Sequence, residues 1–304
     1  MAINGNRYLV VVAGPTAVGK TSVAIALAKQ FSSVIINADS RQIYKELNIG
    51  VAKPSAQELQ EVKHHFVNHI SINESFTASD FEQQCLILLE QLYQTSNVVI
   101  MSGGTGLYIQ AVLEGFDAIP DVEEHFVATL NEEYSLKGIE HLQQELERCD
   151  PTYSASVDKH NPRRLIRAIS VFRAHQKPYS SYLGNTLVSR NFTPILVQLD
   201  RPRELLYQRI NQRVDMMIAD GLEAEVKSLQ GHRHKQALQT VGYTEFFKHF
   251  DRDISKEQAI DLIKQQSRRY AKRQLTWYRK KENWQMLPAD DLLKVSEHIS
   301  SKII

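Results

Sequence analysis

The chain has 304 residues and a mass of 34.8 kDa, which suffices for one large domain or two modest ones. Hydrophobic residues make up 42% and charged residues 23%, which excludes a mainly disordered, collagen-like or low-complexity chain. The 36 Lys and Arg residues balance the 35 Asp and Glu residues to a net charge of +1, so the total charge indicates no partner.

The N-terminal third alternates apolar runs with helical patterns. Continuous apolar runs at 8–14 and 97–104 predict strands buried on both faces, and 33–39 is predicted as another, short strand. The residues 81–94 have helical spacing, and a fourth strand is predicted at 193–200, before a long helix. Strands that alternate with helices predict an α/β fold with a parallel sheet flanked by helices.

The middle of the chain has helical patterns and an uneven charge. Eleven acids stand against two basic residues in 114–150, whereas 159–199 holds seven Lys and Arg residues and no acid. We therefore predict a helical insertion domain at 119–185 within a catalytic core formed by 1–118 and 186–304. Solvated helix faces would also account for such charge runs.

The last third is predicted to be helical. The segment 262–281 contains eight Lys and Arg residues and no acid, and it also carries Tyr270, Trp277 and Tyr278. Cations can contact phosphates while aromatic rings stack on nucleotides, so this composition is typical of a nucleic-acid surface. Solvent-exposed charges around a buried aromatic anchor explain it equally well.

A phosphate-binding loop is the strongest single motif. The residues Gly14, Pro15, Thr16, Ala17, Val18, Gly19, Lys20 and Thr21 match GxxxxGK[ST] between a predicted strand and a predicted helix. Backbone N–H groups of such a loop point at phosphate oxygens, and the lysine and the helix N-terminus add positive charge. The threonine hydroxyl can bind Mg²⁺. We predict a phosphate or diphosphate site here.

The strand that would carry the magnesium-binding acid of an ATPase has none. It ends in Ser102-Gly103-Gly104-Thr105, so the chain is poorly built for nucleoside triphosphate hydrolysis. Asp39 follows the second strand, and the carboxyl ends of parallel strands share one edge of the sheet. It can accept a proton there, or it can cap a helix, and the two roles do not exclude each other.

Several blocks together resemble the tRNA dimethylallyltransferase (tRNA isopentenyltransferase) family. They are GPTAVGKT, ADSRQIY, IGVAKP, SGGTGLY, LDRPRELLYQRINQRVDMMIADGLEAEV, VGYTEF and AKRQLTWYR. The resemblance implies transfer of a dimethylallyl group from dimethylallyl diphosphate to N6 of the adenosine 3′ of the anticodon in tRNA. The loop would then hold the diphosphate, with Mg²⁺ at Thr21.

The resemblance also implies the catalytic residues. Asp39 would be the general base, Lys20 and Arg213 would bind the diphosphate, and Thr105 would touch the acceptor nucleotide. Arg209, one turn before Arg213, is the less favoured choice, and either arginine could instead be a solvated helix residue.

The resemblance places the tRNA contacts in four segments and at two single positions. The residues are Asp39, Ser40, Arg41, Gln42, Thr105, Val127, Arg163, Arg164, Leu165, Ile166, Arg167, Gln239, Thr240, Val241, Gly242, Tyr243, Thr244, Lys272, Arg273, Gln274, Leu275, Thr276, Trp277, Tyr278 and Arg279. Val127 departs from the family pattern, in which a basic residue often stands at this position.

Two other functions share some of these features. A small-molecule kinase would use the loop for ATP, but it explains neither the missing strand-end acid nor the basic C-terminal segment. A non-enzymatic RNA-binding protein would not need the intact Gly19, Lys20 and Thr21.

The sequence predicts a cytoplasmic protein without membrane contact. It has two cysteines, no apolar run of about 18 residues and no signal-peptide pattern. We expect a monomer, because no coiled coil or repeat is visible.

Overall fold

The structure is a computed structural model that describes residues 5–184, 188–279, 281 and 283–303. The chain divides into two compact units, a core unit of 1–113 with 190–304 and a helical unit of 114–189. The sequence puts the first boundary a few residues later, at 118/119. The second predicted boundary, 185/186, falls outside the described residues.

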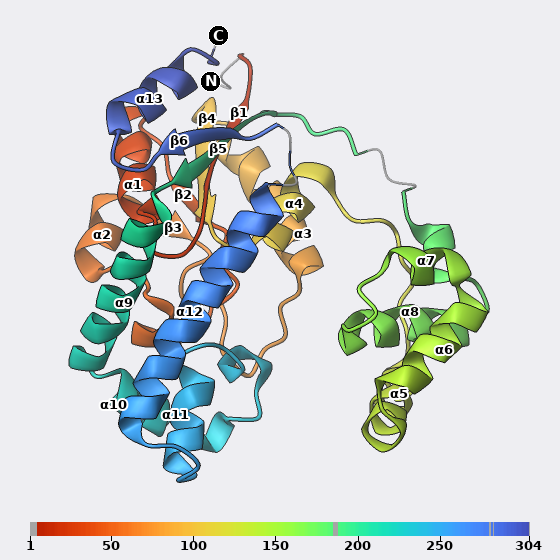
Figure 1. Cartoon of the computed structure of the whole chain (residues 1–304). Helices are drawn as coiled ribbons and strands as arrows, with labels where there is room; N and C mark the ends of the chain where they lie inside the picture. The colour runs from red at the N-terminus through yellow and green to blue at the C-terminus, as the bar shows by residue number, and fades with distance from the viewer. Residues whose placement is uncertain (1–4, 185–187, 280, 282, 304) are drawn as a thin grey trace. The chain divides into compact units, whose positions relative to one another are not determined.

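The core unit contains a six-stranded parallel sheet (Figure 1). Its strands are β1 (Tyr8–Ala13), β2 (Ile35–Asn37), β3 (His64–His65), β4 (Val98–Gly103), β5 (Thr193–Asp200) and β6 (Gln285–Pro288). Their order is β3-β2-β4-β1-β5-β6, which confirms the predicted parallel α/β fold.

The sequence missed two edge strands of this sheet. β3 has only two residues, and β6 has four, of which Leu287 alone is buried. Neither strand makes the continuous apolar run that marks a central parallel strand. The prediction of an all-helical last third was therefore wrong at β6.

Helices cover both faces of the sheet. They are α1 (Lys20–Gln30), α2 (Ala56–Glu61), α3 (Ala78–Leu92), α4 (Gly106–Glu114), α9 (Arg203–Ala219), α10 (Leu222–Ser228), α11 (Tyr243–Phe250), α12 (Lys256–Tyr278) and α13 (Leu292–Ser300). Successive β1 residues point to opposite faces: Leu9 and Val11 pack with α3 and α4, whereas Val10 and Val12 pack with α1 and α13.

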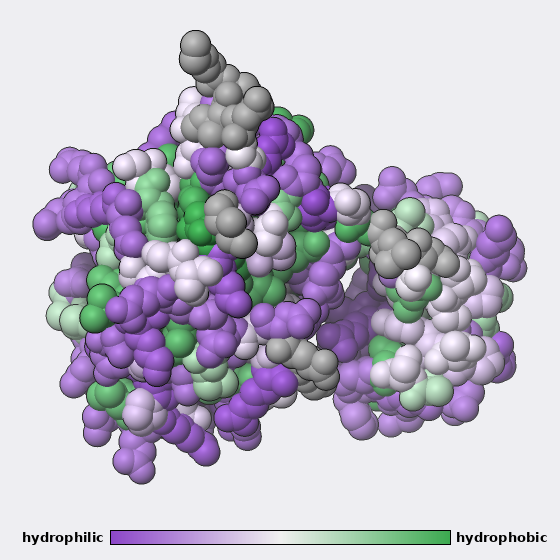
Figure 2. Space-filling view, turned by 90° about the horizontal axis from the view of Figure 1, so that it is seen from above, coloured by the Kyte–Doolittle hydropathy of each residue, from purple (hydrophilic) through white to green (hydrophobic). Residues whose placement is uncertain are grey.

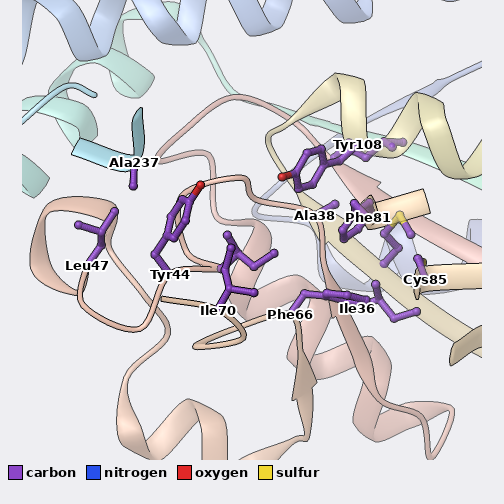
Figure 3. Packing of buried hydrophobic residues seen from close by; sticks show 14 of the residues in the cluster. Ile36, Ala38, Tyr44, Leu47, Phe66, Ile70, Phe81, Cys85, Tyr108 and Ala237 are labelled. Carbon is purple, nitrogen blue, oxygen red and sulfur yellow. The ribbon is translucent and has the colours of Figure 1, made fainter. Parts of the chain in front are cut away.

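The core on the α3 and α4 side also holds the loops that border the site. The Phe81 and Tyr108 rings stack with their centroids 4.4 Å apart. Tyr44, from the segment after β2, belongs to the same cluster (Figure 3). The chain that follows Asp39 is thus anchored in the core.

The end of β4 lies against the end of β2. A Cβ on Gly103 would lie 2.1 Å from the Ala38 carbonyl oxygen, and one on Gly104 would lie 2.4 Å from Gln274 Nε2. Real Cβ atoms do not approach other atoms this closely. Gly103 is therefore required because it meets backbone atoms, whereas a side chain at Gly104 would displace the Gln274 amide.

The helical unit has a core of its own. It comprises α5 (Glu124–Lys137), α6 (Ile139–Cys149), α7 (Pro151–Ser156) and α8 (Pro162–His175). Leu130, Leu142 and Leu165 are fully buried between α5, α6 and α8. Arg173 on α8 donates hydrogen bonds to Glu133 on α5 and Glu145 on α6, which links all three helices.

The described surface shows no sign of a membrane span. Among the helices in the described part of the chain, none is both long and apolar enough to cross a bilayer. The face in Figure 2 is mostly hydrophilic, with hydrophobic side chains in small separate groups.

Candidate active site

The phosphate-binding loop connects β1 to α1 with three residues at positive φ. Gly14, Ala17 and Gly19 have φ values of 151°, 63° and 114°. A Cβ on Gly14 would lie 2.8 Å from the Leu199 carbonyl oxygen. No side chain caps α1, and its first turn carries no acid. The first amides of α1 are thus available to an anion, which the helix dipole favours.

Lys20 lies over the loop that precedes it. Its Nζ donates to the carbonyl oxygens of Gly14 at 3.1 Å and Pro15 at 2.9 Å. Burial lowers the pKa of Lys20 to about 8; nearby Asp39 opposes the shift and Arg213 adds to it. Within the described residues, neither Lys20 nor Arg213 has a carboxylate within ion-pair distance. The site therefore holds positive charge that an anionic ligand can neutralise.

The two candidate arginines of α9 differ in position. Arg213 lines the cavity described below and donates to the Thr16 hydroxyl at 3.1 Å. Burial lowers its pKa, although nearby Asp39 opposes this. Arg209 is exposed and donates to the Ala17 carbonyl at 2.9 Å. Arg213 is thus the arginine directed to the cavity, as the family resemblance favours.

Asp39 has one carboxylate oxygen in a turn. Its Oδ1 accepts from the Arg41 N–H at 2.9 Å and the Gln42 N–H at 3.3 Å. Within the described part of the chain, no hydrogen bond is made to Oδ2. The described residues 39–48 contain no helix, so the helix cap considered from the sequence is wrong; the carboxylate caps a turn and its second oxygen is left for a ligand.

Thr105 connects the β4 edge to the Asp39 loop. Its hydroxyl accepts from the Ser40 N–H at 3.0 Å and contacts the Ser40 hydroxyl at 3.3 Å. Tyr270 on α12 lines the cavity described below, although 37% of its surface is exposed. Desolvation of its hydroxyl raises the pKa of Tyr270, and nearby Asp39 adds to the shift.

Several of these residues line one cavity of about 590 Å³ in the core unit, whereas Lys20 and Thr105 are not among its lining residues. Its wall contains the loop residues Thr16 and Ala17, the acid Asp39 and the arginines Arg213 and Arg273. Predicted residues separated by more than 200 positions are thus brought together. The remaining lining comes from Ser40, Arg41, Gly50, Val51, Ile210, Val214, Met217, Gln239, Thr240, Val241, Gly242, Thr244, Glu245, Ile263, Gln266, Ser267 and Tyr270.

The segment 239–244 forms part of that wall, with one exception. Tyr243 is fully buried and donates to Glu225 Oε1 at 2.6 Å. The same carboxylate accepts from the N–H groups of Ile49 at 2.7 Å and Gly50 at 3.0 Å. Tyr243 therefore fixes the wall and its side chain is not accessible to RNA.

The segment 272–279 has an exposed and a buried face, because it is helical. Lys272, Arg273, Thr276 and Arg279 are exposed, and Leu275 and Trp277 are partly buried. Gln274 and Tyr278 are 7% and 1% exposed. A Cβ on Gly106 would lie 2.7 Å from the Trp277 ring, so this ring packs on the start of α4.

The predicted residues of the helical unit divide in the same way. Arg163, Arg164 and Arg167 are exposed on α8, whereas Leu165 and Ile166 belong to the core of the unit. Val127 also packs against that core. The side chains of these three apolar residues are needed for packing, which leaves the arginines as the accessible part of the segment.

Sequence reasoning missed Tyr270 and misplaced Gln274. Tyr270 stands in the basic run and lines the cavity, but its aromatic ring alone did not separate it from a core residue. Gln274 was grouped with its basic neighbours. The buried positions Ala271, Gln274 and Tyr278 follow a helical 3-and-4 spacing, which could have revealed its orientation.

Thr21 fits the predicted magnesium position in a limited sense. It is partly buried at the start of α1, and no described residue hydrogen-bonds to its hydroxyl.

A second group with metal-ligand spacing lies in the helical unit and consists of Glu133, His141 and Glu145. Arg173 neutralises both of those carboxylates, and it holds the pKa of Glu133 at about 2.

Comparison with known proteins identifies the family. Residues 42–281 match the family model described as IPP transferase. The chain is 45% identical to the tRNA dimethylallyltransferase of Flavobacterium johnsoniae, covering 91% of this chain and 92% of the relative. It is 44% identical to that of Flavobacterium psychrophilum, over 98% and 99% of the two chains.

Solved structures give the same result. The full-length tRNA isopentenylpyrophosphate transferase of Bacillus halodurans is 33% identical with a TM-score of 0.73, over 98% of this chain and 97% of that one. A eukaryotic dimethylallyltransferase acting on tRNA is 26% identical with a TM-score of 0.80, over 98% of this chain and 77% of that one. The chain therefore belongs to the IPP transferase family, the family of the tRNA dimethylallyltransferases.

Proposed function

We propose that the chain transfers a dimethylallyl group from dimethylallyl diphosphate to N6 of the adenosine 3′-adjacent to the anticodon in tRNA. The observation that carries this proposal is the single cavity lined by phosphate-loop residues, by Arg213 and by Asp39. A diphosphate on the loop and an adenine at Asp39 would meet there. A direct transfer, without a covalent enzyme intermediate, requires the dimethylallyl carbon and the adenine N6 to be in contact in one site.

The reaction has one bond broken, one bond formed and one proton moved. The allylic C–O bond breaks as N6 bonds to the same carbon, and the diphosphate leaves with the electron pair. The loop amides, Lys20 and Arg213 stabilise the charge that grows on the diphosphate. Asp39 Oδ2 takes the N6 proton. Mg²⁺ at the Thr21 hydroxyl would add positive charge to the diphosphate.

The adenine must leave its stack to reach this cavity, because N6 is not accessible within a stacked loop. The exposed cations of α12 border the cavity at Arg273, where they can hold the phosphates that flank the displaced base. The exposed arginines of α8 supply further phosphate contacts. Mg²⁺ dependence, a cytoplasmic location and a monomeric state stay predictions.

The direct test is mass spectrometry of tRNA after incubation with the protein, Mg²⁺ and dimethylallyl diphosphate. We expect one dimethylallyl group on the adenosine next to the anticodon. A parallel incubation with ATP tests the small-molecule kinase. Phosphorylated product with ATP and unmodified tRNA with dimethylallyl diphosphate would reject the proposal.

Binding of inorganic diphosphate should take up a proton through Lys20. Because burial holds the Lys20 pKa at about 8, the amine is mostly neutral at about pH 8.5 in the free protein, and a bound anion raises that pKa. Affinity for diphosphate should therefore fall as the pH rises through 8. Calorimetry in buffers of different ionisation enthalpy measures the uptake. Equal uptake by Lys20→Met would contradict this assignment.

Affinity for an anticodon stem-loop RNA should decrease steeply with salt. Each phosphate contact contributes a log–log slope of about −0.7 to −0.9, so the double variant Lys272→Ala/Arg273→Ala should make the slope shallower by roughly 1.5. The matched control is Lys294→Ala/Lys302→Ala, which removes the same charge from exposed positions on and after α13. Equal slopes for the two double variants would place Lys272 and Arg273 away from the RNA.

A further inference from the structure

A buried glutamine of α12 joins the two loops of the cavity. Gln274 Oε1 accepts from the Thr16 N–H at 2.9 Å, and Gln274 Nε2 donates to the Gly104 carbonyl oxygen at 2.8 Å. The side chain is 7% exposed. One amide thus links the phosphate-binding loop after β1 to the turn after β4.

The two linked loops hold different substrates in the proposed function. Thr16 belongs to the diphosphate loop, and its hydroxyl also accepts from Arg213 at 3.1 Å. Gly104 precedes Thr105, whose hydroxyl accepts from Ser40 next to Asp39. The distance between the leaving group and the accepting nitrogen therefore depends on how these two loops are held.

The amide group is the chemistry that this position needs. It must accept a hydrogen bond from an N–H and donate one to a carbonyl at the same time. A carboxylate can accept but cannot donate, and an apolar side chain leaves both buried backbone groups without partners. The space is also restricted, since a Cβ on Gly104 would lie 2.4 Å from Gln274 Nε2.

We infer that Gln274 is a positioning residue that sets the diphosphate loop against the Thr105 turn, and that it does not itself bind tRNA. This inference rests on the proposed function. Because the Thr16 N–H donates to Gln274, it is not available to the diphosphate, and the later loop amides are the ones that can bind phosphate oxygens. Its neighbours Lys272 and Arg273 remain exposed, so one short segment of α12 has an RNA side and a loop side.

The test compares Gln274→Met, Gln274→Glu and Gly104→Ala with the wild-type protein. Gln274→Met keeps the length but loses both hydrogen bonds, and Gln274→Glu keeps only the acceptor. Gly104→Ala leaves Gln274 in the sequence and displaces its amide, which can move because it ends a flexible side chain. The control is Gln265→Met, the same substitution at an exposed position of α12.

We expect all three test variants to lower the single-turnover rate at saturating substrates by about 10–100-fold, because a displacement of about 1 Å can have such an effect. Affinity for the stem-loop RNA should stay within about threefold. Hydrogen exchange should become faster at 14–21 and at 103–106 together, and Gln265→Met should change none of these.

Three outcomes distinguish the possibilities. Wild-type protein that forms no product rejects the proposed function itself. If the wild-type protein is active and the single-turnover rates of Gln274→Met and Gly104→Ala lie within threefold of its rate, the inference is overturned. Weaker RNA binding with an unchanged saturated rate also overturns it, because Gln274 would then be a tRNA contact. Thermal melts of each variant separate loss of rate from loss of fold.

Discussion

Replacing Asp39 with Asn is expected to lower single-turnover product formation by about 10²–10⁴-fold, the usual effect of losing a general base. Adenine N6 is a weak nucleophile because its lone pair is delocalised into the ring. Attack on the allylic carbon leaves a cationic nitrogen that must lose a proton. Asn retains the shape and one acceptor oxygen, but it cannot take that proton.

The structure explains why this variant should still fold. Asp39 Oδ1 accepts from the Arg41 and Gln42 N–H groups, and an Asn oxygen can make the same turn. The matched control is Asp291→Asn, in which the carboxylate caps α13 through the Lys294 N–H at 3.0 Å, and no residue of that helix lines the cavity. If Asp39→Asn lowered the single-turnover rate by less than tenfold with an unchanged melting temperature, Asp39 would serve only to hold the turn.

Replacing Lys20 with Met is expected to lower turnover by about 10²–10³-fold, the range found when a preorganised donor to a developing anion is removed. Lys20 lies over Gly14 and Pro15, so it meets the diphosphate and not the RNA. Affinity for the stem-loop RNA should therefore hardly change. The measurement is the single-turnover rate at saturating dimethylallyl diphosphate, with RNA binding measured separately.

Lys29→Met is the control for Lys20→Met. It makes the same substitution at the other end of α1, where Lys29 forms an exposed ion pair with Glu61 at 2.7 Å. Surface pairs of this kind contribute little to stability, so turnover should remain normal. If Lys20→Met also showed near-normal turnover, Lys20 would not be a diphosphate-binding residue.

Features that depend on residues adjacent in the chain could be predicted from the sequence. The central strands are continuous apolar runs, and the phosphate loop is eight consecutive residues whose geometry requires Gly14 and Gly19. The position of Asp39 near the phosphate loop followed from its place at the end of the second strand, and that of Arg213 followed from the family resemblance. The structure places both residues at the cavity. Their proposed chemical roles stay predictions.

The sequence could not predict what depends on distant contacts. Gln274 bonds to residues 258 and 170 positions away, and nothing adjacent to it in the chain indicates either partner. Likewise, β6 is a strand because it pairs with β5, while its own residues are mostly exposed. The family resemblance covers the segment 163–167 as a whole, so it does not separate Leu165 and Ile166 from the arginines beside them. In the helix, Leu165 and Ile166 share the buried face with Ala168 and Ile169, because residues three or four apart lie on one face.

The close approach of Gly103 to Ala38 also limits how this fold can change through evolution. An acid at the end of β4 would be needed to hold magnesium for nucleoside triphosphate hydrolysis. The first atom of any side chain at Gly103 would lie 2.1 Å from the Ala38 carbonyl oxygen, so no single substitution there introduces such an acid. The ends of β2 and β4 would first have to separate, and that separation would displace the loop that carries Asp39.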